Sequence, residues 1–345
     1  MTITERELFS QYQAMERTYD HVLSVADDLN AYLSTASYDR IIFIGCGSSY
    51  CLAKSAAAAA NLYLKTPAFA HPAGDLLLSF PRYHPLLEGA LLVSISRSGS
   101  TTEVVELCKK AADEMNCPIL SLCAKVDSVL SRIAGFNLEI PWAFDESVCQ
   151  TRCVTNLYLA VMLMIGIVAQ NQAMIQSLKS VVENGPAFIQ TQRNLLEQIA
   201  AGVWKKITVL ADGELAGIAE EGALAFTEIA LLPSHYYHLL DVRHGPMVLI
   251  DSDTLVIAAL VPGEAAHQNK LLADIKKQGA QLVVYSDARA DVQAADHHIT
   301  VPPQGAYAAQ GIPFIFLAQA ISLFRALKDG INPDQPAGLD PWIKL

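Results

Sequence analysis

The sequence is short of the features that mark several common protein classes. Its seven cysteines include no CxxC pair and follow no regular spacing. An odd number of cysteines, in a chain whose start lacks the charged-then-apolar layout of a secretory signal, favours free thiols in a reducing cytosol. No GxGxxG follows the first predicted strand and no GxxxxGKS/T occurs, so neither a dinucleotide site nor an ATP phosphate loop is indicated. We therefore expect a cytoplasmic protein that uses no cofactor.

Basic residues are also scarce, with 24 lysines and arginines against 35 aspartates and glutamates, for a net charge of −11. Nucleic acids attract basic surfaces, so this charge argues against DNA or RNA as a main partner. A small anionic ligand stays open, because backbone amides and hydroxyls bind phosphate locally. Hydrophobic residues make up 52% and charged residues 17% of the 345 positions. This is ample apolar material for two domains and indicates no wholesale disorder.

Long hydrophobic runs and metal-ligand clusters are absent as well. The longest apolar run, residues 157–169, is too short to cross a bilayer and is typical of a buried helix, so no membrane association is predicted. His235 and His238 have a ligand-like spacing on a predicted helix, but no third ligand is evident. A satisfied interface or core pair is the favoured interpretation, and we expect no metal site.

What the sequence does contain is a β-loop-α pattern that occurs twice. In the first half, four apolar runs predict buried parallel strands, at residues 41–44, 91–95, 118–123 and 137–140. Predicted helices at 53–64 and 102–115 lie between them. Equivalent runs recur roughly 160 to 166 residues later, at 207–210, 254–260, 282–285 and 298–301. The pattern predicts an α/β fold of two doubly wound parallel sheets related by internal duplication.

The same pattern predicts how the chain is divided. Residues 1–38 are expected to form an N-terminal helical segment, because their apolar residues recur near helical spacing. Residues 39–170 and 201–330 then form the two α/β domains, with a helical linker at 171–200 and a C-terminal tail at 331–345.

Two loops of the first half have the composition of a phosphate site. Residues 45–49 (Gly-Cys-Gly-Ser-Ser) follow the first strand, and residues 96–102 (Ser-Arg-Ser-Gly-Ser-Thr-Thr) follow the second. In an open parallel sheet, ligands bind outside the carboxyl ends of the strands. Both loops combine glycine with hydroxyls and open a predicted helix, whose first turn offers free N–H groups and a partial positive charge. Ordinary turns and helix caps are the alternative, but two such loops at equivalent positions favour phosphate binding.

Four motifs in order make the chain similar to the sugar isomerase (SIS) family: residues 45–50 (GCGSSY), 96–103 (SRSGSTTE), 146–151 (ESVCQT) and 243–246 (RHGP). The chain resembles the isomerase part of glucosamine-6-phosphate synthase and the fructosamine- and glucoselysine-6-phosphate deglycases, over nearly its whole length. The resemblance implies two flavodoxin-like SIS domains, a sugar phosphate as ligand, and a homodimer or higher homo-oligomer. It also implies that the C-terminal tail lies near the active site.

The resemblance assigns roles to individual residues. It assigns the sugar phosphate to side chains of the two loops, with an amide near the sugar hydroxyls: Ser48, Ser49, Ser96, Arg97, Ser98, Thr101 and Gln150. Residues 220–229 resemble the family's catalytic helix, in which Glu228 moves a proton between C1 and C2 and Glu221 is a further candidate. His244 matches the histidine that assists ring opening and that often comes from the neighbouring subunit.

The expected chemistry requires these residue types. Moving a proton between adjacent sugar carbons needs a carboxylate that acts first as base and then as acid. Ring opening needs a group that titrates near neutral pH, as histidine does. A surface carboxylate is the alternative for Glu228, but Phe226 and Ile229 indicate a buried helix face beside it. A structural histidine at the turn before Gly245 is the alternative for His244.

The chain departs from the synthase at two lysine positions. The helix lysine is replaced by Ala225 and the Schiff-base lysine of the tail by Pro341, although Lys344 stands three residues further on. A substrate that already carries an amine can form the imine without an enzyme lysine. Together with Arg243, which stands where the synthase has lysine, these changes favour a deglycase that hydrolyses an amino-substituted hexose 6-phosphate. An aldose–ketose isomerase, an amino-sugar-phosphate deaminase and a non-catalytic sugar-phosphate sensor are the alternatives.

Overall fold

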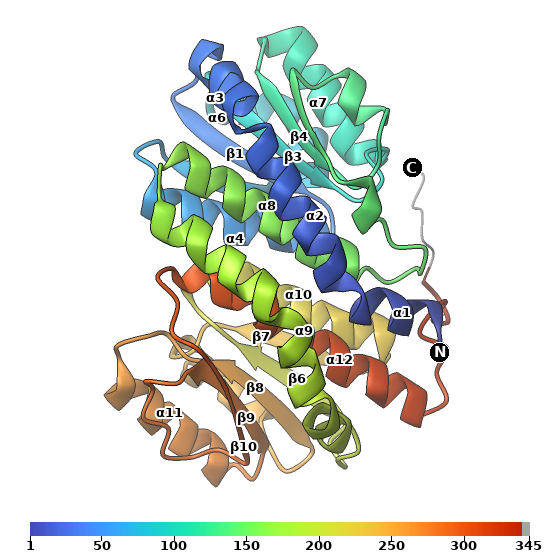
Figure 1. Cartoon of the computed structure of the whole chain (residues 1–345), viewed down its shortest axis with the longest axis vertical. Helices are drawn as coiled ribbons and strands as arrows, with labels where there is room; N and C mark the ends of the chain where they lie inside the picture. Colours follow the sequence, from blue (N-terminus) through green and yellow to red (C-terminus); the bar gives the residue numbers. More distant parts are fainter. Residues whose placement is uncertain (340–345) are drawn as a thin grey trace.

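The structure, a computed structural model, describes residues 1–339 and contains a parallel five-stranded sheet in each half of the chain (Figure 1). The first sheet has the strand order β2-β1-β3-β4-β5 and the second β10-β9-β8-β6-β7. Counted from the first strand of each half, the two orders are the same, which confirms the predicted duplication of a doubly wound α/β unit. The strands are β1 (Arg40–Gly45), β2 (Ala68–Pro72), β3 (Ala90–Ser96), β4 (Ile119–Cys123), β5 (Phe136–Glu139), β6 (Lys206–Leu210), β7 (Ser234–Tyr237), β8 (Thr254–Ala259), β9 (Gln281–Asp287) and β10 (His297–Val301).

Helices follow the strands in the order that the β-loop-α pattern predicted. The α-helices are α1 (Ile3–Phe9), α2 (Gln11–Ser24), α3 (Ala26–Thr35), α4 (Ser48–Tyr63), α5 (Ala73–Leu78), α6 (His84–Leu87), α7 (Thr102–Met115), α8 (Arg152–Val168), α9 (Gln172–Ala200), α10 (Ala216–Ile229), α11 (Ala265–Lys277) and α12 (Gly311–Lys328). The range predicted as the N-terminal helical segment contains α1 to α3, and the range predicted as the linker is one long helix, α9.

The inner faces of the two sheets share one core. Along β1, Ile41 and Phe43 point into this shared core, whereas Ile42 and Ile44 point into a separate cluster on the outer face. This alternation is the period of a strand buried on both faces, and it explains why the strand is an uninterrupted apolar run in the sequence. The outer face of the second sheet has its own cluster, which it shares with α11.

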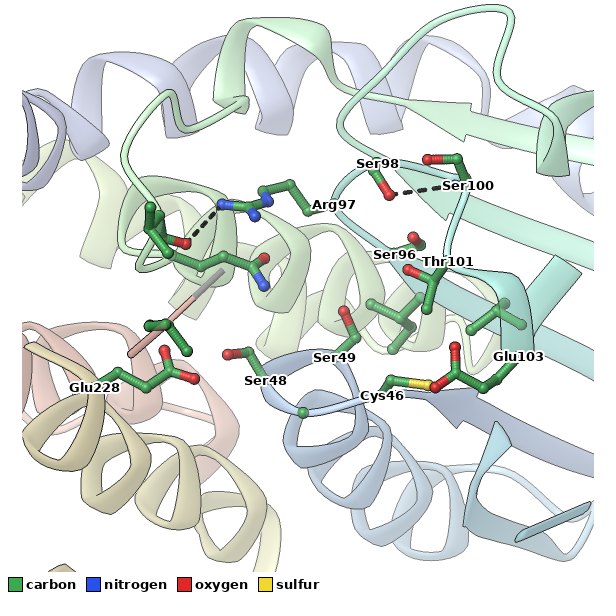
Figure 2. Close-up of a pocket in the computed structure, with 16 residues that line it drawn as sticks. Cys46, Ser48, Ser49, Ser96, Arg97, Ser98, Ser100, Thr101, Glu103 and Glu228 are labelled. Carbon is green, nitrogen blue, oxygen red and sulfur yellow. Dashed lines mark hydrogen bonds between the residues drawn. The ribbon is translucent and has the colours of Figure 1, made fainter. Parts of the chain in front are cut away.

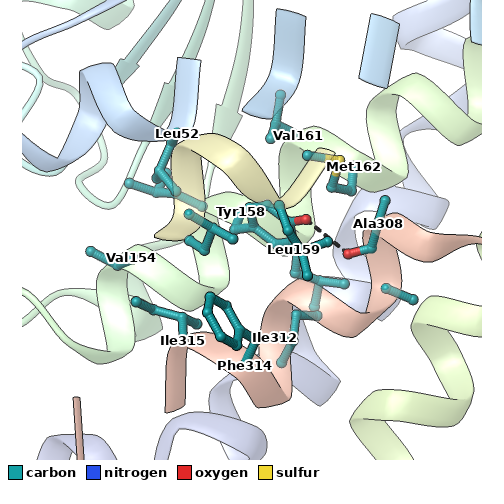
Figure 3. Packing of buried hydrophobic residues seen from close by; sticks show 14 of the residues in the cluster. Leu52, Val154, Tyr158, Leu159, Val161, Met162, Ala308, Ile312, Phe314 and Ile315 are labelled. Carbon is teal, nitrogen blue, oxygen red and sulfur yellow. Dashed lines mark hydrogen bonds between the residues drawn. The ribbon is translucent and has the colours of Figure 1, made fainter. Parts of the chain in front are cut away.

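Helix α8 lies at the centre of the shared core, where every residue from Cys153 to Ile167 is buried. Figure 3 shows Tyr158 and Leu159 of α8 among residues of α4 and α12, including Leu52 and Phe314. The Tyr158 hydroxyl donates a hydrogen bond of 2.8 Å to the backbone carbonyl of Ala308. The buried helix predicted from the longest apolar run is confirmed, and it joins the two halves into one packed body.

One helical segment of residues 1–339, Tyr307–Lys328, is long and apolar enough to cross a membrane by length and composition. Most of this segment is buried inside the protein, where its helix α12 packs against α9 and α10. Its apolar surface is therefore covered by the protein's own helices.

Each sheet has an edge strand that the apolar pattern did not predict. β2 and β7 pair on one side only, with β1 and β6. The side chains of β2 and β7 are mixed and mostly partly exposed, so no apolar run marks these two strands. The expectation that His235 and His238 lie on a helix is wrong, since His235 is in β7. Within the described part of the chain, no group of three or more side chains could hold a metal ion.

Candidate active site

A cavity of about 300 Å³ opens at the carboxyl ends of β1 and β3 (Figure 2). Its lining comes from three stretches of the first half, from α10 and from the C-terminal segment: Cys46, Gly47, Ser48, Ser49, Ile95, Ser96, Arg97, Ser98, Ser100, Thr101, Glu103, Val104, Val148, Gln150, Glu228 and Leu339. This is the point where the strand order of the first sheet reverses, the usual ligand position in such sheets. The fold brings together all seven predicted phosphate-site residues and Glu228.

The first loop turns sharply into α4. Gly47 has a φ of +53°, a conformation that favours glycine, and Ser48 and Ser49 follow it in the first turn of the helix. Gly45 leaves no room for a side chain, because a Cβ there would lie 2.5 Å from the carbonyl carbon of Ser49. The loop therefore brings two serine hydroxyls and the positive end of the α4 dipole to the cavity (Figure 2).

The second loop is curled by its own hydroxyls. Gly99 has a φ of +60°, and its N–H donates to Ser96 Oγ at 2.9 Å. The N–H of Ser100 donates to Ser98 Oγ at 3.2 Å. Thr101 precedes α7 without capping it through its side chain, and it lines the cavity opposite the first loop (Figure 2). The two loops thus present hydroxyls from both sides of one space, as a phosphate requires.

Arg97 brings positive charge to the cavity wall. It is only 8% exposed, and its Nη1 donates to the backbone carbonyls of Ser147 and Val148, each at 3.1 Å. Gln150 lies on the loop that contains Ser147 and Val148. Its amide oxygen is buried with no hydrogen-bond partner within residues 1–339. A buried amide without a partner is costly unless a ligand pairs with it. Arg97 and Gln150 therefore suit an anionic ligand that carries hydroxyls.

Two carboxylates of α10 lie beside the cavity. Burial raises the pKa of Glu228 to about 7, although the Arg97 charge acts in the opposite direction. Glu221 is 1% exposed; burial and then the Glu228 charge raise its pKa well above its ordinary value, against a hydrogen bond from Ser48. Near neutral pH, Glu228 can therefore both take and return a proton, and burial shifts Glu221 toward its protonated form. Figure 2 shows the Glu228 carboxylate directed toward Ser48.

Two further predicted residues, His244 and Arg243, do not line this cavity. His244 follows the short helix η5 (Asp241–Arg243) and is exposed. Arg243 forms an ion pair of 2.8 Å with Asp274 of α11. The fold of one chain does not bring His244 to Glu228, so its role at a site shared with another subunit stays a prediction. Lys344 lies outside the described residues.

Some lining residues were not predicted from the sequence. Glu103 has a buried carboxylate oxygen without a described partner, and its place at the end of the second loop motif could have identified it. Leu339 comes from the C-terminal segment, and no sequence pattern marks it. Burial and the Glu103 charge raise the pKa of Cys46 to about 11, so this thiol stays protonated and is a small filler rather than a nucleophile.

Comparison with known protein families finds one match in each half of the chain. The SIS domain model matches residues 34–167 and 203–325. The D-galactosamine-6-phosphate deaminase of Escherichia coli is 27% identical, with 97% of this chain aligned to 92% of that protein. The isomerizing glutamine–fructose-6-phosphate aminotransferase of Haemophilus ducreyi is also 27% identical, over 90% of this chain, but the chain spans only 52% of that protein.

A solved structure is similar along the entire fold. The tagatose-6-phosphate ketose/aldose isomerase of Escherichia coli has a TM-score of 0.86 and 25% sequence identity, over 99% of this chain and 97% of that chain. The two ranges matched by the family model contain β1 to β5 and β6 to β10, and with them every cavity-lining residue except Leu339. The chain therefore belongs to the SIS domain family, with one copy of the domain in each half.

Proposed function

We propose that this protein releases an amine from an amino-substituted hexose 6-phosphate, of the fructosamine- or glucoselysine-6-phosphate type, and leaves the sugar 6-phosphate. One observation carries the proposal. Glu228, whose pKa is raised to about 7, faces a cavity whose other walls are the two hydroxyl-rich loops and Arg97. Such a cavity would hold the phosphate at the loops and the reacting carbons at Glu228.

The phosphate would bind to the hydroxyls of Ser49, Ser96, Ser98 and Thr101 at the positive end of α4. Arg97 would add a charge-assisted contact, and the unpaired Gln150 amide would accept from a sugar hydroxyl. Binding the phosphate at one end leaves C1 and C2 of the open-chain sugar toward α10, where Glu228 lies. Binding of the phosphate at one end of the substrate thus positions the reacting carbons at the other end.

The proton step follows from the position of Glu228. The carboxylate takes a proton from C1 of the ketosamine, which forms the 1,2-enaminol, and returns it to C2, which forms an imine between C1 and the amine nitrogen. Water then adds to C1, the C1–N bond breaks, and the products are the free amine and the aldose 6-phosphate. One water molecule is consumed, and Glu228 ends in its starting state.

The absence of a nearby lysine supports a substrate that brings its own amine. No lysine lines the cavity within residues 1–339. Ala225, at the position of the synthase helix lysine, is buried in a small apolar cluster with Cys149 and Ile229. The substrate nitrogen can provide the imine that an enzyme lysine would otherwise provide.

A deaminase acting on a hexosamine 6-phosphate is the second candidate. The similarity to the galactosamine-6-phosphate deaminase, 27% identical over 97% of this chain, favours it. The same carboxylate would move the proton from C2 to C1, and water would release ammonia from an imine at C2. The two candidates differ in which carbon carries nitrogen and in the size of the leaving group.

We further propose that the site is completed in a homodimer by His244 of a second copy. His244 is exposed on its own chain, and Val248 and Leu249, 84% and 55% exposed, lie a few residues further along the same segment. An exposed apolar patch beside a predicted site residue suits a subunit contact. Mixing inactive His244→Ala and Glu228→Gln chains should restore about a quarter of wild-type activity, because half of the dimers then hold one intact site. A fully active monomer in sedimentation would contradict this arrangement.

The function is tested by measuring amine and sugar phosphate separately after incubation with several substrates. The panel contains glycated amino acid 6-phosphates, hexosamine 6-phosphates and fructose 6-phosphate. Amine from the glycated substrates supports the deglycase, and ammonia from hexosamine phosphates alone supports the deaminase. Ketose–aldose interconversion without amine release identifies an isomerase, and binding without turnover identifies a sensor. A borohydride-trapped sugar adduct on Lys344 would overturn the lysine-free mechanism.

A further inference from the structure

The loop of residues 144–151 contributes Val148 and Gln150 to one wall of the cavity. Helix α1 is hydrogen-bonded to this loop. Glu7 of α1 is fully buried. Its Oε1 accepts a hydrogen bond from the N–H of Glu146 at 2.6 Å, and its Oε2 accepts one from the N–H of Ser147 at 3.3 Å. The carboxylate thus pairs two consecutive peptide N–H groups of the loop.

Two backbone carbonyls of the same loop accept hydrogen bonds from Arg97. Its Nη1 donates to the carbonyls of Ser147 and Val148. The backbone of Ser147 therefore donates to Glu7 through its N–H and accepts from Arg97 through its carbonyl. The Arg97 charge acts on Glu228 across the cavity. A shift of Ser147 away from α1 would therefore move the acceptors that fix this guanidinium.

Two further charged residues anchor the loop at its ends. Asp145 Oδ2 accepts from the N–H groups of Thr151 and Cys153, at 2.7 and 2.9 Å, where α8 begins. Arg152 lies 3.6 Å from the carboxylates of both Glu7 and Asp145. One arginine thus lies close to two buried carboxyl groups. Burial, together with the charge of Glu7, raises the pKa of Asp145 to about 7. The arrangement leaves the Glu7 charge paired and its two oxygens directed at the loop.

The C-terminal segment joins the same unit. The Asp334 carboxylate accepts from the N–H groups of Ile3 and Thr4 at the start of α1, at 2.9 and 2.7 Å. The N–H of Val148 donates to the Asp334 carbonyl at 3.1 Å. Helix α1, the loop and the segment that leads to Leu339 are therefore hydrogen-bonded together behind the cavity wall.

We propose that Glu7 is a positioning residue: its buried carboxylate holds the 144–151 loop where the loop fixes Arg97 beside Glu228 and the substrate phosphate. The inference rests on the function proposed above. Glu7 does not line the cavity, so it acts only through the loop and Arg97. Supporting groups of this kind set the geometry of a site that they do not touch.

The test compares Glu7→Gln with Glu5→Gln, which makes the same change of charge on the same helix and removes the partly exposed ion pair with Arg193. In Glu7→Gln, one oxygen becomes an NH₂ group that faces a loop N–H or Arg152. We expect kcat/KM to fall about tenfold or more, and the acid limb of its pH profile to move upward because Arg97 no longer lowers the pKa of Glu228. Glu5→Gln should leave both unchanged.

Hydrogen exchange gives a readout that needs no substrate. The amides of Glu146 and Ser147 should exchange faster in Glu7→Gln than in wild type or Glu5→Gln. If Glu7→Gln does not fold, Glu7→Asp, which keeps the charge but shortens the reach, serves in its place and should give a smaller change in the same direction. Faster exchange with unaltered kcat/KM and pH profile would reduce Glu7 to a structural role and overturn the proposal. Wild-type protein that turns over no substrate would refute the proposed function instead.

Discussion

After β1 the chain passes through residues 46–48 into α4, and after β6 it passes through residues 212–214 toward α10. A glycine with positive φ stands at the turn in both halves, with φ values of +53° at Gly47 and +61° at Gly213. The side chains around the turn differ. The first half has a thiol and hydroxyls there, and the second half has the carboxylates of an aspartate and a glutamate.

These second-half carboxylates are engaged by the protein itself. Glu214 accepts from the Tyr63 hydroxyl at 2.8 Å, and Asp212 lies 2.6 Å from His238. A Cβ added at Gly213 would meet the ring of Tyr307 at 3.9 Å, so a partly buried tyrosine lies beside the turn. Carboxylates would repel a phosphate here, and aromatic side chains fill the space that the first half leaves open.

The second pair of loops differs in the same way. Gly99 and Gly263 both have positive φ, but Val261 stands where the first half has Arg97. The Gln268 side chain pairs with both the N–H and the carbonyl of Val261, at 2.8 and 2.9 Å. A duplicated fold thus repeats the position of a ligand site without repeating the site. One copy provides the two hydroxyl-rich loops that line the cavity, and the other provides the helix that carries Glu228.

The largest effect should follow from breaking this division of roles at Glu228. Glu228→Gln keeps the shape but removes the base, so kcat should fall on the order of a hundredfold or more while KM stays nearly constant. Glu220→Gln on the neighbouring face of α10, where the glutamate pairs with Lys54, is the matched control and should stay active. Near-normal turnover of Glu228→Gln would show that the second half does not provide the proton-transfer group.

A glycine substitution in each half sharpens the comparison of the loops. At Gly99 a Cβ would meet Ser128 Oγ at 2.3 Å and Cys123 Sγ at 2.9 Å, whereas at Gly263 it would meet no atom within 4 Å. Both changes cost about 1–2 kcal/mol through the positive φ. Only Gly99→Ala should also displace the phosphate loop and raise KM, by about tenfold or more. Equal changes in KM from the two variants would contradict the assignment of the phosphate to the first half.

The sequence was sufficient for the central strands and for the two loops, and physical reasons explain what it missed. A strand such as β1, buried on both faces, is an unbroken apolar run, and glycine with hydroxyls at its end marks the loop. The edge strands β2 and β7 carry no such run. Glu7 contacts the 144–151 loop and Leu339 lines the cavity because segments far apart in the chain meet there, and a local pattern does not record such contacts. His244 is exposed in the single chain, and its predicted role at a site shared with another subunit can be tested only in the oligomer.

The pH dependence of the reaction tests whether Arg97, absent from the second half, tunes the carboxylate. Burial raises the pKa of Glu228 to about 7, so the proton-accepting form is lost as pH falls below that value. The kcat/KM of wild type should therefore rise with pH through an acid limb near 7. In Arg97→Gln the limb should move to higher pH, because the opposing positive charge is gone. Arg40→Gln, which removes a cation at the start of β1, away from the cavity, should leave the limb in place.

The smallest effect on activity should come from the second-half loop itself. Glu214 is 5% exposed and accepts from Tyr63 of α4, so its carboxylate joins the two halves rather than facing a ligand. Glu214→Gln keeps an acceptor but loses the charge, which should lower the free energy of unfolding by about 1–2 kcal/mol. Tyr63→Phe removes the same bond from the other side, so the double variant should lose less stability than the sum of the single changes. Both variants should keep wild-type KM for the sugar phosphate at temperatures where they are folded. A raised KM in Glu214→Gln with unchanged stability would mean that this loop also senses a ligand, and the contrast between the two halves would then be wrong.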